Sequence, residues 1–497
     1  MFPSKQLLNV HQNLYKVFPT LHVLSKLGFL FSCLLILPAL ISLAYNDGLI
    51  ETFLISGVLA ASACLFIWGV TKRFEQELKP REGFTLVFAM WMGFALVASL
   101  PFYLHLPKMG FTDAFFEAMS GLTTTGATAI TNLDALPPSL NFWRHFLIWI
   151  GGMGIIVLAV AILPMLGVGG MQLYKAEMPG LNKDTKLAPR ITQTAKHLWV
   201  IYFALTIICF LALKIAGMSW LDAICHAFST LGLGGVSSHN EGIAYFDSIP
   251  IELIISLFTI IGGINFANHF FAVRQKSFKI YAKDLETRVL LIILLGSCVL
   301  MSLFLWLDGF YGFWASIRYV FFTFISFGLA SGFSNTNFAE WPLAVSLWMF
   351  LLANFLASSG STGGGIKMVR AIILFKYAIR EMTLLLHPHA VRTVKINQRL
   401  IPEHTALAVM AFIFVYFSTI VIFTFAMMFT GFDFMSAFTA IIASITNTGT
   451  GLGAVGPSGS FATLSALQKW ICLSVMLLGR LEIFTILILF TPAYWRK

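Results

Sequence analysis

Four short segments rich in glycine, threonine and serine carry the chemistry that this sequence suggests. They read LTTTGAT (122–128), TLGLGGVS (230–237), LASGFSNT (329–336) and ITNTGTGLG (445–453). None contains a charged residue, and each lies between a short aromatic segment and a long apolar one. Successive glycines lie roughly 100 residues apart, which indicates four copies of one unit. Four such loops are enough to close a ring around one pore.

The residue types in these loops favour coordination of a monovalent cation. Rings of backbone carbonyls replace the hydration shell of potassium, and glycine reaches the required dihedral angles at little steric cost. A short helix ending at each loop would point its negative dipole end at the pore. A single loop of this kind would more often be a small-residue contact between helices. The fourfold recurrence favours the pore.

Composition places the loops in a membrane protein. The chain has 497 residues, of which 58% are hydrophobic and 11% are charged, whereas a soluble protein carries about a quarter charged residues. The net charge of +10 comes mainly from basic loops between apolar spans, so the positive-inside bias explains it without a nucleic acid partner. The six cysteines lie singly, without metal-ligand spacing, and no covalent cofactor is expected.

The order of apolar segments predicts an all-α polytopic membrane protein of about ten spans. Two leading spans, 27–44 and 53–70, lack the loop motif. Each following repeat has a span, a short helix, a loop and a second span, including one predicted over 470–490. Asp113, Asp222 and Asp433 are predicted to cap short helices. The expected parts are 1–83 for the leading helices and 84–197, 198–288, 289–403 and 404–497 for four pseudo-symmetric repeats around one pore.

Basic residues are distributed unevenly along this order. The segments 71–82, 174–197, 274–288 and 367–399 fall on one side of the membrane, together with both termini, whereas the opposite loops carry few basic residues. The positive-inside bias therefore predicts that both termini are cytoplasmic.

Two features near the ends of the third and fourth repeats suggest control of the pore. The stretch SSGSTGGG (358–365) interrupts a long apolar segment and is either a kink or a movable gate. Arg480 and Glu482 are the only charges in 470–490. A charge at a helix centre costs about 2.5–3.5 kcal/mol, so Arg480 marks the pore or forms an ion pair with another helix. Lys367 and Arg370 are predicted to be interfacial anchors.

Several motifs together resemble the Trk/Ktr/HKT superfamily of potassium transporters, and within it the bacterial Trk-type uptake channel subunits. The resemblance covers nearly the whole chain, including the two leading spans. It implies four M1–P–M2 repeats, similar to a potassium channel subunit, and an intramembrane gate. Besides the loops, the motifs are AEMPG (176–180), PRITQTAK (189–196), GSTGGGIKM (360–368) and GRLEIFT (479–485).

The resemblance also implies which residues hold potassium and which gate it. Glycine in all four loops favours potassium over sodium. The filter glycines would be Gly126, Gly234, Gly332 and Gly449. The other coordinating carbonyls would come from Thr124, Thr125, Gly232, Leu233, Ala330, Ser331, Asn447 and Thr448. The gate would comprise the loop with Gly360, Gly363, Gly364 and Gly365, together with Arg480.

Partners follow from the same resemblance. The chain would work as a homodimer in the bacterial cytoplasmic (inner) membrane. A nucleotide-binding regulatory subunit would dock on the cytoplasmic segments 174–197, 274–288 and 367–400. The sequence shows no P-loop or Rossmann fingerprint, so any nucleotide control would come from this partner. One alternative is a symporter coupling potassium to protons or sodium, although such carriers usually show inverted repeats and buried carboxylates. Another is an integral-membrane enzyme, for which the sequence shows no catalytic motif.

Overall fold

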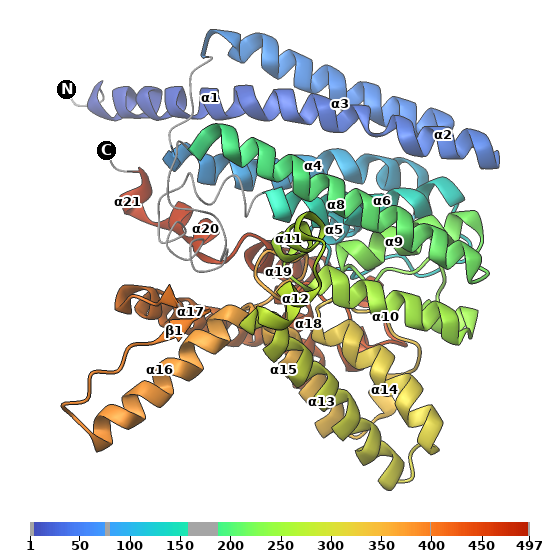
Figure 1. The fold of residues 1–497 in the computed structure, drawn as a ribbon. Helices are drawn as coiled ribbons and strands as arrows, with labels where there is room; N and C mark the ends of the chain where they lie inside the picture. The colour runs from blue at the N-terminus through green and yellow to red at the C-terminus, as the bar shows by residue number, and fades with distance from the viewer. Residues whose placement is uncertain (1–3, 75–79, 158–186, 398, 496–497) are drawn as a thin grey trace. The chain divides into compact units, whose positions relative to one another are not determined.

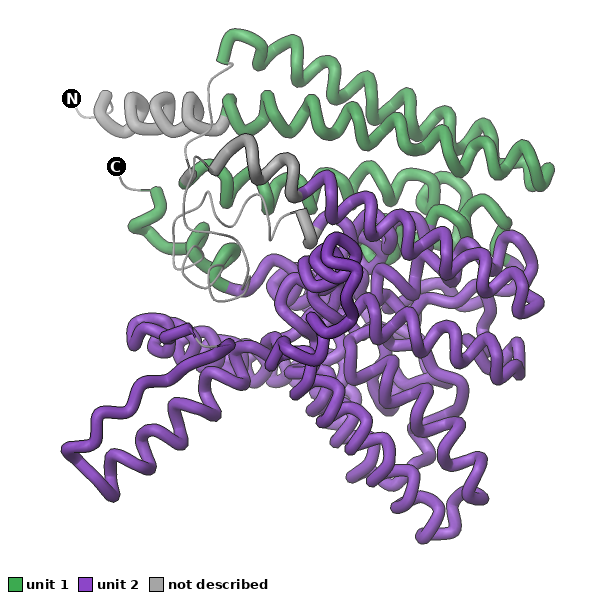
Figure 2. The backbone as a smooth tube through the Cα atoms, in the orientation of Figure 1, with its two compact units in different colours: residues 1–119, 136–143, 484–497 green, residues 120–135, 144–483 purple. Residues whose placement is uncertain are grey.

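The computed structural model describes residues 4–74, 80–157, 187–397 and 399–495. It divides into two compact units (Figure 2). Unit 1 comprises residues 1–119, 136–143 and 484–497, and unit 2 comprises residues 120–135 and 144–483. The AEMPG motif and most of the basic segment 174–197 lie outside the described residues.

Unit 1 contains the predicted leading spans. Helix α1 packs against α3 and α4, and α2 packs against α3. Asp47, in the turn between α2 and α3, accepts a hydrogen bond from the Ser139 amide at 2.9 Å. The helices and 3₁₀ turns of this unit are α1 (Ser4–Cys33), α2 (Ile36–Tyr45), α3 (Ile50–Thr71), η1 (Lys72–Phe74), α4 (Pro80–His105), α20 (Phe484–Leu487), η7 (Ile488–Phe490) and α21 (Pro492–Trp495).

Two helices, α5 (Phe111–Leu122) and α6 (Pro138–Val157), begin in unit 1 and end in unit 2. The other helices of unit 2 are α8 (Leu187–Ile215), α9 (Trp220–Gly232), α10 (Ile249–Gly263), α11 (Phe266–Gln275), α12 (Lys279–Lys283), α13 (Leu285–Leu307), α14 (Phe313–Gly328), α15 (Leu343–Phe355), α16 (Met368–Leu386), α17 (Glu403–Phe429), α18 (Phe434–Ile445) and α19 (Ala466–Arg480). The 3₁₀ turns are η3 (Gly242–Phe246), η4 (Phe338–Glu340), η5 (Gly453–Val455) and η6 (Phe461–Thr463).

A small antiparallel hairpin connects α16 to α17 (Figure 1). Its strands are β1 (Lys395–Ile396) and β2 (Arg399–Leu400), with Lys395 opposite Leu400. The Asn397 backbone at the turn adopts a φ of 46°, a left-handed conformation that asparagine tolerates better than most residues.

Short apolar helices lead to the four loops. Helices α5, α9, α14 and α18 have 12, 13, 16 and 12 residues, whereas crossing a bilayer takes about 20. Of the three aspartates predicted as caps, Asp433 is an N-cap and accepts from the Ser436 amide at 3.0 Å. Asp113 lies within the first turn of α5. Ser219 caps α9 in place of Asp222, which follows in the first turn.

Six helices among the described residues are long and apolar enough to span a membrane, and eight if two bent pairs each count as one span. The α10–α11 pair bends by 96°. The predicted break at 358–365 is found between α15 and α16. The span predicted over 470–490 is not one continuous helix, because α19 ends at Arg480 and α20 begins at Phe484. Between them, Glu482 has a left-handed φ of 53°.

Candidate functional site

The four loops share one backbone geometry where they leave their short helices. One residue in each adopts a left-handed φ between 52° and 58°: Thr124, Leu233, Ala330 and Asn447. The next residue donates its amide hydrogen to the carbonyl five residues earlier. These bonds are Thr125 to Ser120 at 2.8 Å, Gly234 to Ser229 at 2.9 Å, Ser331 to Ser326 at 2.8 Å and Thr448 to Ala443 at 2.9 Å. The loops are therefore structural equivalents, residue by residue.

This equivalence corrects the register expected for the second loop. The glycine two residues after the left-handed residue has a positive φ in every loop: Gly126 (80°), Gly235 (58°), Gly332 (95°) and Gly449 (79°). Gly235 thus occupies the position that the sequence assigned to Gly234, and Gly234 corresponds to Thr125. The shift arises because Leu233, not Gly232, is the residue that turns left-handed.

The four glycines join the loops into a closed ring. A Cβ atom placed on any of them would collide with a carbonyl oxygen of the neighbouring loop. The pairs are Gly126 with Gly234, Gly235 with Ser331, Gly332 with Thr448, and Gly449 with Thr125. The contacts therefore run from the first loop to the fourth and back to the first. The Asn447 side-chain amide supports this last step by donating to Thr125 Oγ1 at 2.9 Å.

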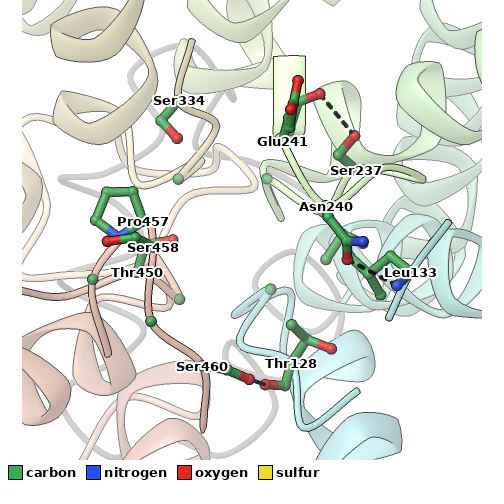
Figure 3. A pocket seen from close by; sticks show the side chains of 18 of the residues that line it. Thr128, Leu133, Ser237, Asn240, Glu241, Ser334, Thr450, Pro457, Ser458 and Ser460 are labelled. Atoms are coloured by element: carbon green, nitrogen blue, oxygen red, sulfur yellow. Dashed lines mark hydrogen bonds between the residues drawn. The ribbon is translucent and has the colours of Figure 1, made fainter. Parts of the chain in front are cut away.

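A pocket of about 920 Å³ opens on the side of the ring where the chain leaves the loops (Figure 3). All four ring glycines line it. Its charged or titratable lining residues are Arg144, His239 and Glu241. The rim is held by hydrogen bonds between loops: the Asn240 side-chain oxygen accepts from the Leu133 amide at 2.9 Å. This pocket can admit a hydrated ion to the ring.

The glycine-rich loop between α15 and α16 lies on the other side, against the ends of three short helices. Thr362 Oγ1 donates to the Leu231 carbonyl of α9 at 3.0 Å. A Cβ on Gly363 would lie 3.0 Å from the Leu329 carbonyl, next to the end of α14. A Cβ on Gly364 would collide with the Thr446 carbonyl, next to the end of α18. Gly360 and Gly365 give this loop its turns, with φ of 70° and 84°.

Arg480 connects this loop to α6. Its side chain is 2% exposed and its guanidinium donates to the Thr362 carbonyl at 2.8 Å and to the Gly151 carbonyl at 2.9 Å. Gly151 in turn packs so closely on the end of α5 that a Cβ there would collide with the Leu122 carbonyl. The guanidinium therefore lies where the carbonyl ends of the short helices converge.

Two basic residues next to the loop are not interfacial anchors, contrary to the prediction. Arg370 is 4% exposed, donates to Glu482 at 2.8 Å and lies 4.1 Å from the centre of the Phe412 ring. Lys367 is also buried and donates to the Gly363 carbonyl. Both side chains bind protein groups, so they belong to the surroundings of the glycine-rich loop. Neither position had a sequence signal that distinguished it from an anchor.

Metal-ligand geometry is not found elsewhere in the described part of the chain. No group of three or more histidine, cysteine, aspartate or glutamate side chains is placed to hold a metal ion among those residues. His226 is buried and bonds the Asp222 carbonyl at 2.8 Å and Ser237 at 3.0 Å. Oxygen atoms of the ring are thus the stronger candidates for cation binding.

Fold and site together define a helical membrane protein in which four loops, each following a short helix, form a ring beside a pocket. The family model described as TrkH, a cation transport protein, matches residues 51–497. The chain belongs to the TrkH family, as the motifs indicated. Members of this family are transporters, which sets aside the membrane enzyme considered from the sequence.

Individual relatives match nearly the full length. The Trk system potassium uptake protein TrkH of Salmonella typhimurium is 44% identical over 477 residues, covering 96% of this chain and 98% of the relative. The protein of the same name from Halomonas elongata is 43% identical over 478 residues, covering 96% and 99%. The crystal structure of the potassium transporter TrkH from Vibrio parahaemolyticus superposes with a TM-score of 0.89 at 39% identity, covering 96% and 99%.

Proposed function

We propose that this chain takes up potassium through a pore along the axis of the four loops. The observation that carries the proposal is the closed ring of glycine–carbonyl contacts, because a continuous ring is what a carbonyl-lined filter requires. The names of the full-length relatives favour potassium as the transported ion. Potassium is therefore the ligand, and no other cofactor is needed.

The filter is formed by the left-handed residue and the two residues after it in each loop. In the first, third and fourth loops these are the residues expected from the sequence. In the second loop the structural equivalence moves the proposed ligands by one position, to Leu233, Gly234 and Gly235. The short helices point their carbonyl ends toward the inner side of this ring, which favours a cation there.

The loop 358–365 and Arg480 form the gate. Thr362, Gly363 and Gly364 cover the inner ends of three short helices. The Arg480 guanidinium holds the loop in this position and places a fixed positive charge where a cation would have to pass. A charge desolvated in this way raises the barrier for a like charge. The arrangement described here is accordingly the closed gate.

The distribution of basic residues indicates how the chain is oriented in the membrane. Both termini and the segments 274–288 and 367–400 lie in the cytoplasm, and the chain spans the inner membrane. Residues 84–197, 198–288, 289–403 and 404–497 form four M1–P–M2 repeats, preceded by the two leading helices. The chain works as a homodimer and binds a cytoplasmic nucleotide-binding regulatory subunit. The relatives' name, Trk system, fits such an assembly.

The proposal is tested by expressing the chain in bacterial cells that lack potassium uptake. Growth at low external potassium, with 86Rb⁺ accumulation that sodium does not compete away, is the expected result. A Gly332→Ala variant serves as the control, since it introduces a Cβ that collides with the Thr448 carbonyl in the ring. Correctly inserted protein that gives no potassium-dependent growth would contradict the proposal.

A further inference from the structure

One buried carboxylate binds both ends of the glycine-rich loop. Glu286 Oε1 accepts a hydrogen bond from the Ser359 amide at 2.8 Å and another from the Val369 amide at 3.2 Å. The Glu286 residue is 6% exposed. Because a single oxygen atom receives both bonds, the two ends of the loop are held at a fixed separation. The residues between them include the segment that covers the short-helix ends.

The carboxylate also replaces a missing cap on α16. This helix begins at Met368, and its N-cap residue, Lys367, has a left-handed φ of 76° and makes no side-chain cap bond. The first amides of a helix carry partial positive charge and need acceptors. Glu286 supplies a charged acceptor to one of them, at Val369. Loss of the carboxylate therefore removes one anchor of the loop and the acceptor at the start of the helix that follows it.

Glu286 is itself positioned from the hairpin between β1 and β2. It is the second residue of α13, whose N-cap, Asp284, accepts from the Thr287 amide at 3.0 Å. Asn397, at the hairpin turn, donates to Asp284 Oδ1 at 3.0 Å, and its side-chain oxygen accepts from the Leu285 amide at 3.1 Å. The hairpin turn is thus hydrogen-bonded to Asp284 and Leu285, the two residues that precede Glu286.

We propose that Glu286 is a positioning residue that holds the gate loop closed and that Asn397 places this residue under control of the cytoplasmic hairpin. Displacing the hairpin breaks both Asn397 bonds, lets the start of α13 move and withdraws the Glu286 oxygen from the loop. This inference rests on the proposed function for the identity of the gate. The physical coupling of hairpin and loop does not depend on which ion passes.

The test compares Glu286→Ala, Glu286→Gln and a control, Glu403→Ala. Glu403 is also an acidic first-turn residue of a spanning helix, but its side chain is 75% exposed. Two readouts are used on purified full-length protein without any partner. One is 86Rb⁺ leak from proteoliposomes. The other is maleimide labelling of a Ser361→Cys reporter in detergent, corrected for native cysteines; Ser361 is 2% exposed.

Glu286→Ala is expected to raise both the leak and the labelling rate at least about tenfold, because two hydrogen bonds to a charged acceptor are lost. Glu286→Gln is expected to change either less than about threefold, since an amide oxygen still accepts both bonds. Glu403→Ala should match the unmodified chain. If Glu286→Ala is not monodisperse, Glu286→Asp replaces it, because its carboxylate is one methylene too short to reach both amides.

Asn397→Gly tests the second half of the proposal, because glycine keeps the left-handed turn and removes both side-chain bonds. Its labelling rate should also rise at least about threefold. A labelling rate in Glu286→Ala equal to that of the unmodified chain would overturn the positioning role of Glu286. An equal rate in Asn397→Gly would overturn the coupling to the hairpin. If labelling rises while no chain conducts Rb⁺ under any condition, the positioning role stands and the proposed function fails.

Discussion

Gly449 leaves no room for a side chain between the fourth loop and the first. Its φ is 79°, and a Cβ there would meet the Thr125 carbonyl and would lie 2.7 Å from the Ala127 amide nitrogen. Both neighbours are backbone atoms, which cannot rotate away as a side chain can. Ring closure is therefore decided at single positions by the presence or absence of one carbon atom.

Gly449→Ala is expected to lower 86Rb⁺ uptake at least about tenfold, because left-handed strain of about 1–2 kcal/mol adds to a backbone collision. The matched control is Gly48→Ala, whose φ is also 79° but whose Cβ would have no atom within 4 Å. Uptake assays at equal expression compare the two. Normal rubidium affinity in Gly449→Ala would contradict the ring.

The register of the second loop gives a paired prediction. Gly235→Ala should abolish selective uptake, because its Cβ would collide with the Ser331 carbonyl at a φ of 58°. The nearest atoms to a Cβ on Gly234 belong to the Ile148 side chain, the closest at 2.5 Å, so Gly234→Ala should keep rubidium selectivity at reduced thermal stability. Reversal potentials in Rb⁺ and Na⁺ distinguish the two. The opposite ranking would restore the register expected from the sequence.

The sequence predicts the existence of each loop better than its register. GLGG offers three glycines, and propensity alone assigns the left-handed turn to Gly232 more readily than to Leu233. In the structure Leu233 takes the left-handed turn, because the helix before it ends one residue later than Gly232 suggests. The Leu233 amide donates to the Thr230 carbonyl, and the Gly234 amide donates to the Ser229 carbonyl. Glycine content alone therefore does not reveal which of the adjacent residues turns left-handed.

Among elements, two helix breaks differ in how clearly the sequence signals them. The break before α16 has a clear sequence signal in SSGSTGGG, whereas the break after α19 falls at LEI, without glycine or proline. There the chain turns at Glu482, which pairs with Arg370 across 112 positions in sequence. A turn stabilised by a partner so distant in sequence cannot be read from the local residues. The break within the span expected at 470–490 therefore has no local sequence signal.

If the loop 358–365 gates the pore as proposed, Arg480→Ala is expected to raise the partner-free 86Rb⁺ leak at least about tenfold, because two charged hydrogen bonds to this loop and to α6 are lost. Arg480→Lys should lie between this variant and the unmodified chain. It keeps the charge, but a single ammonium group lacks the planar fork that reaches both carbonyls. Proteoliposome flux measures the effect. An unchanged leak in Arg480→Ala would show that the loop is held without this side chain.

The start of α18 gives a prediction on stability. The Ser436 amide bond to Asp433 lowers the pKa of that carboxyl below its ordinary value of 3.8. The stabilisation is therefore complete above pH 3.8 and is lost as the pH falls through the lower folded-state pKa. Asp433→Ala should reduce stability at pH 7 by about 0.5–2 kcal/mol, and Asp433→Ser should recover most of it. Thermal unfolding in detergent measures both.

On the scale of the whole molecule, passive flux through a pore is to be distinguished from transport coupled to a proton or sodium gradient. The four loops contain no carboxylate, and their glycine–carbonyl contacts follow one another in a single order around the ring, whereas many coupled carriers are built from inverted repeats. We expect 86Rb⁺ flux to follow its own electrochemical gradient and to be unchanged when proton or sodium gradients are collapsed. Accumulation that requires either gradient would favour the symporter.

Because all four loops of the ring belong to one polypeptide, the sequence of each loop can change independently of the other three. The residue that presents its carbonyl oxygen to the neighbouring glycine is Thr125, Gly234, Ser331 and Thr448 in the four loops, so the side chains around the ring differ although the backbone contact is the same. A homotetramer must alter four sites whenever its gene changes one. In this chain, mutations can disrupt one, two or three loops separately and so test how many intact loops ion transport requires.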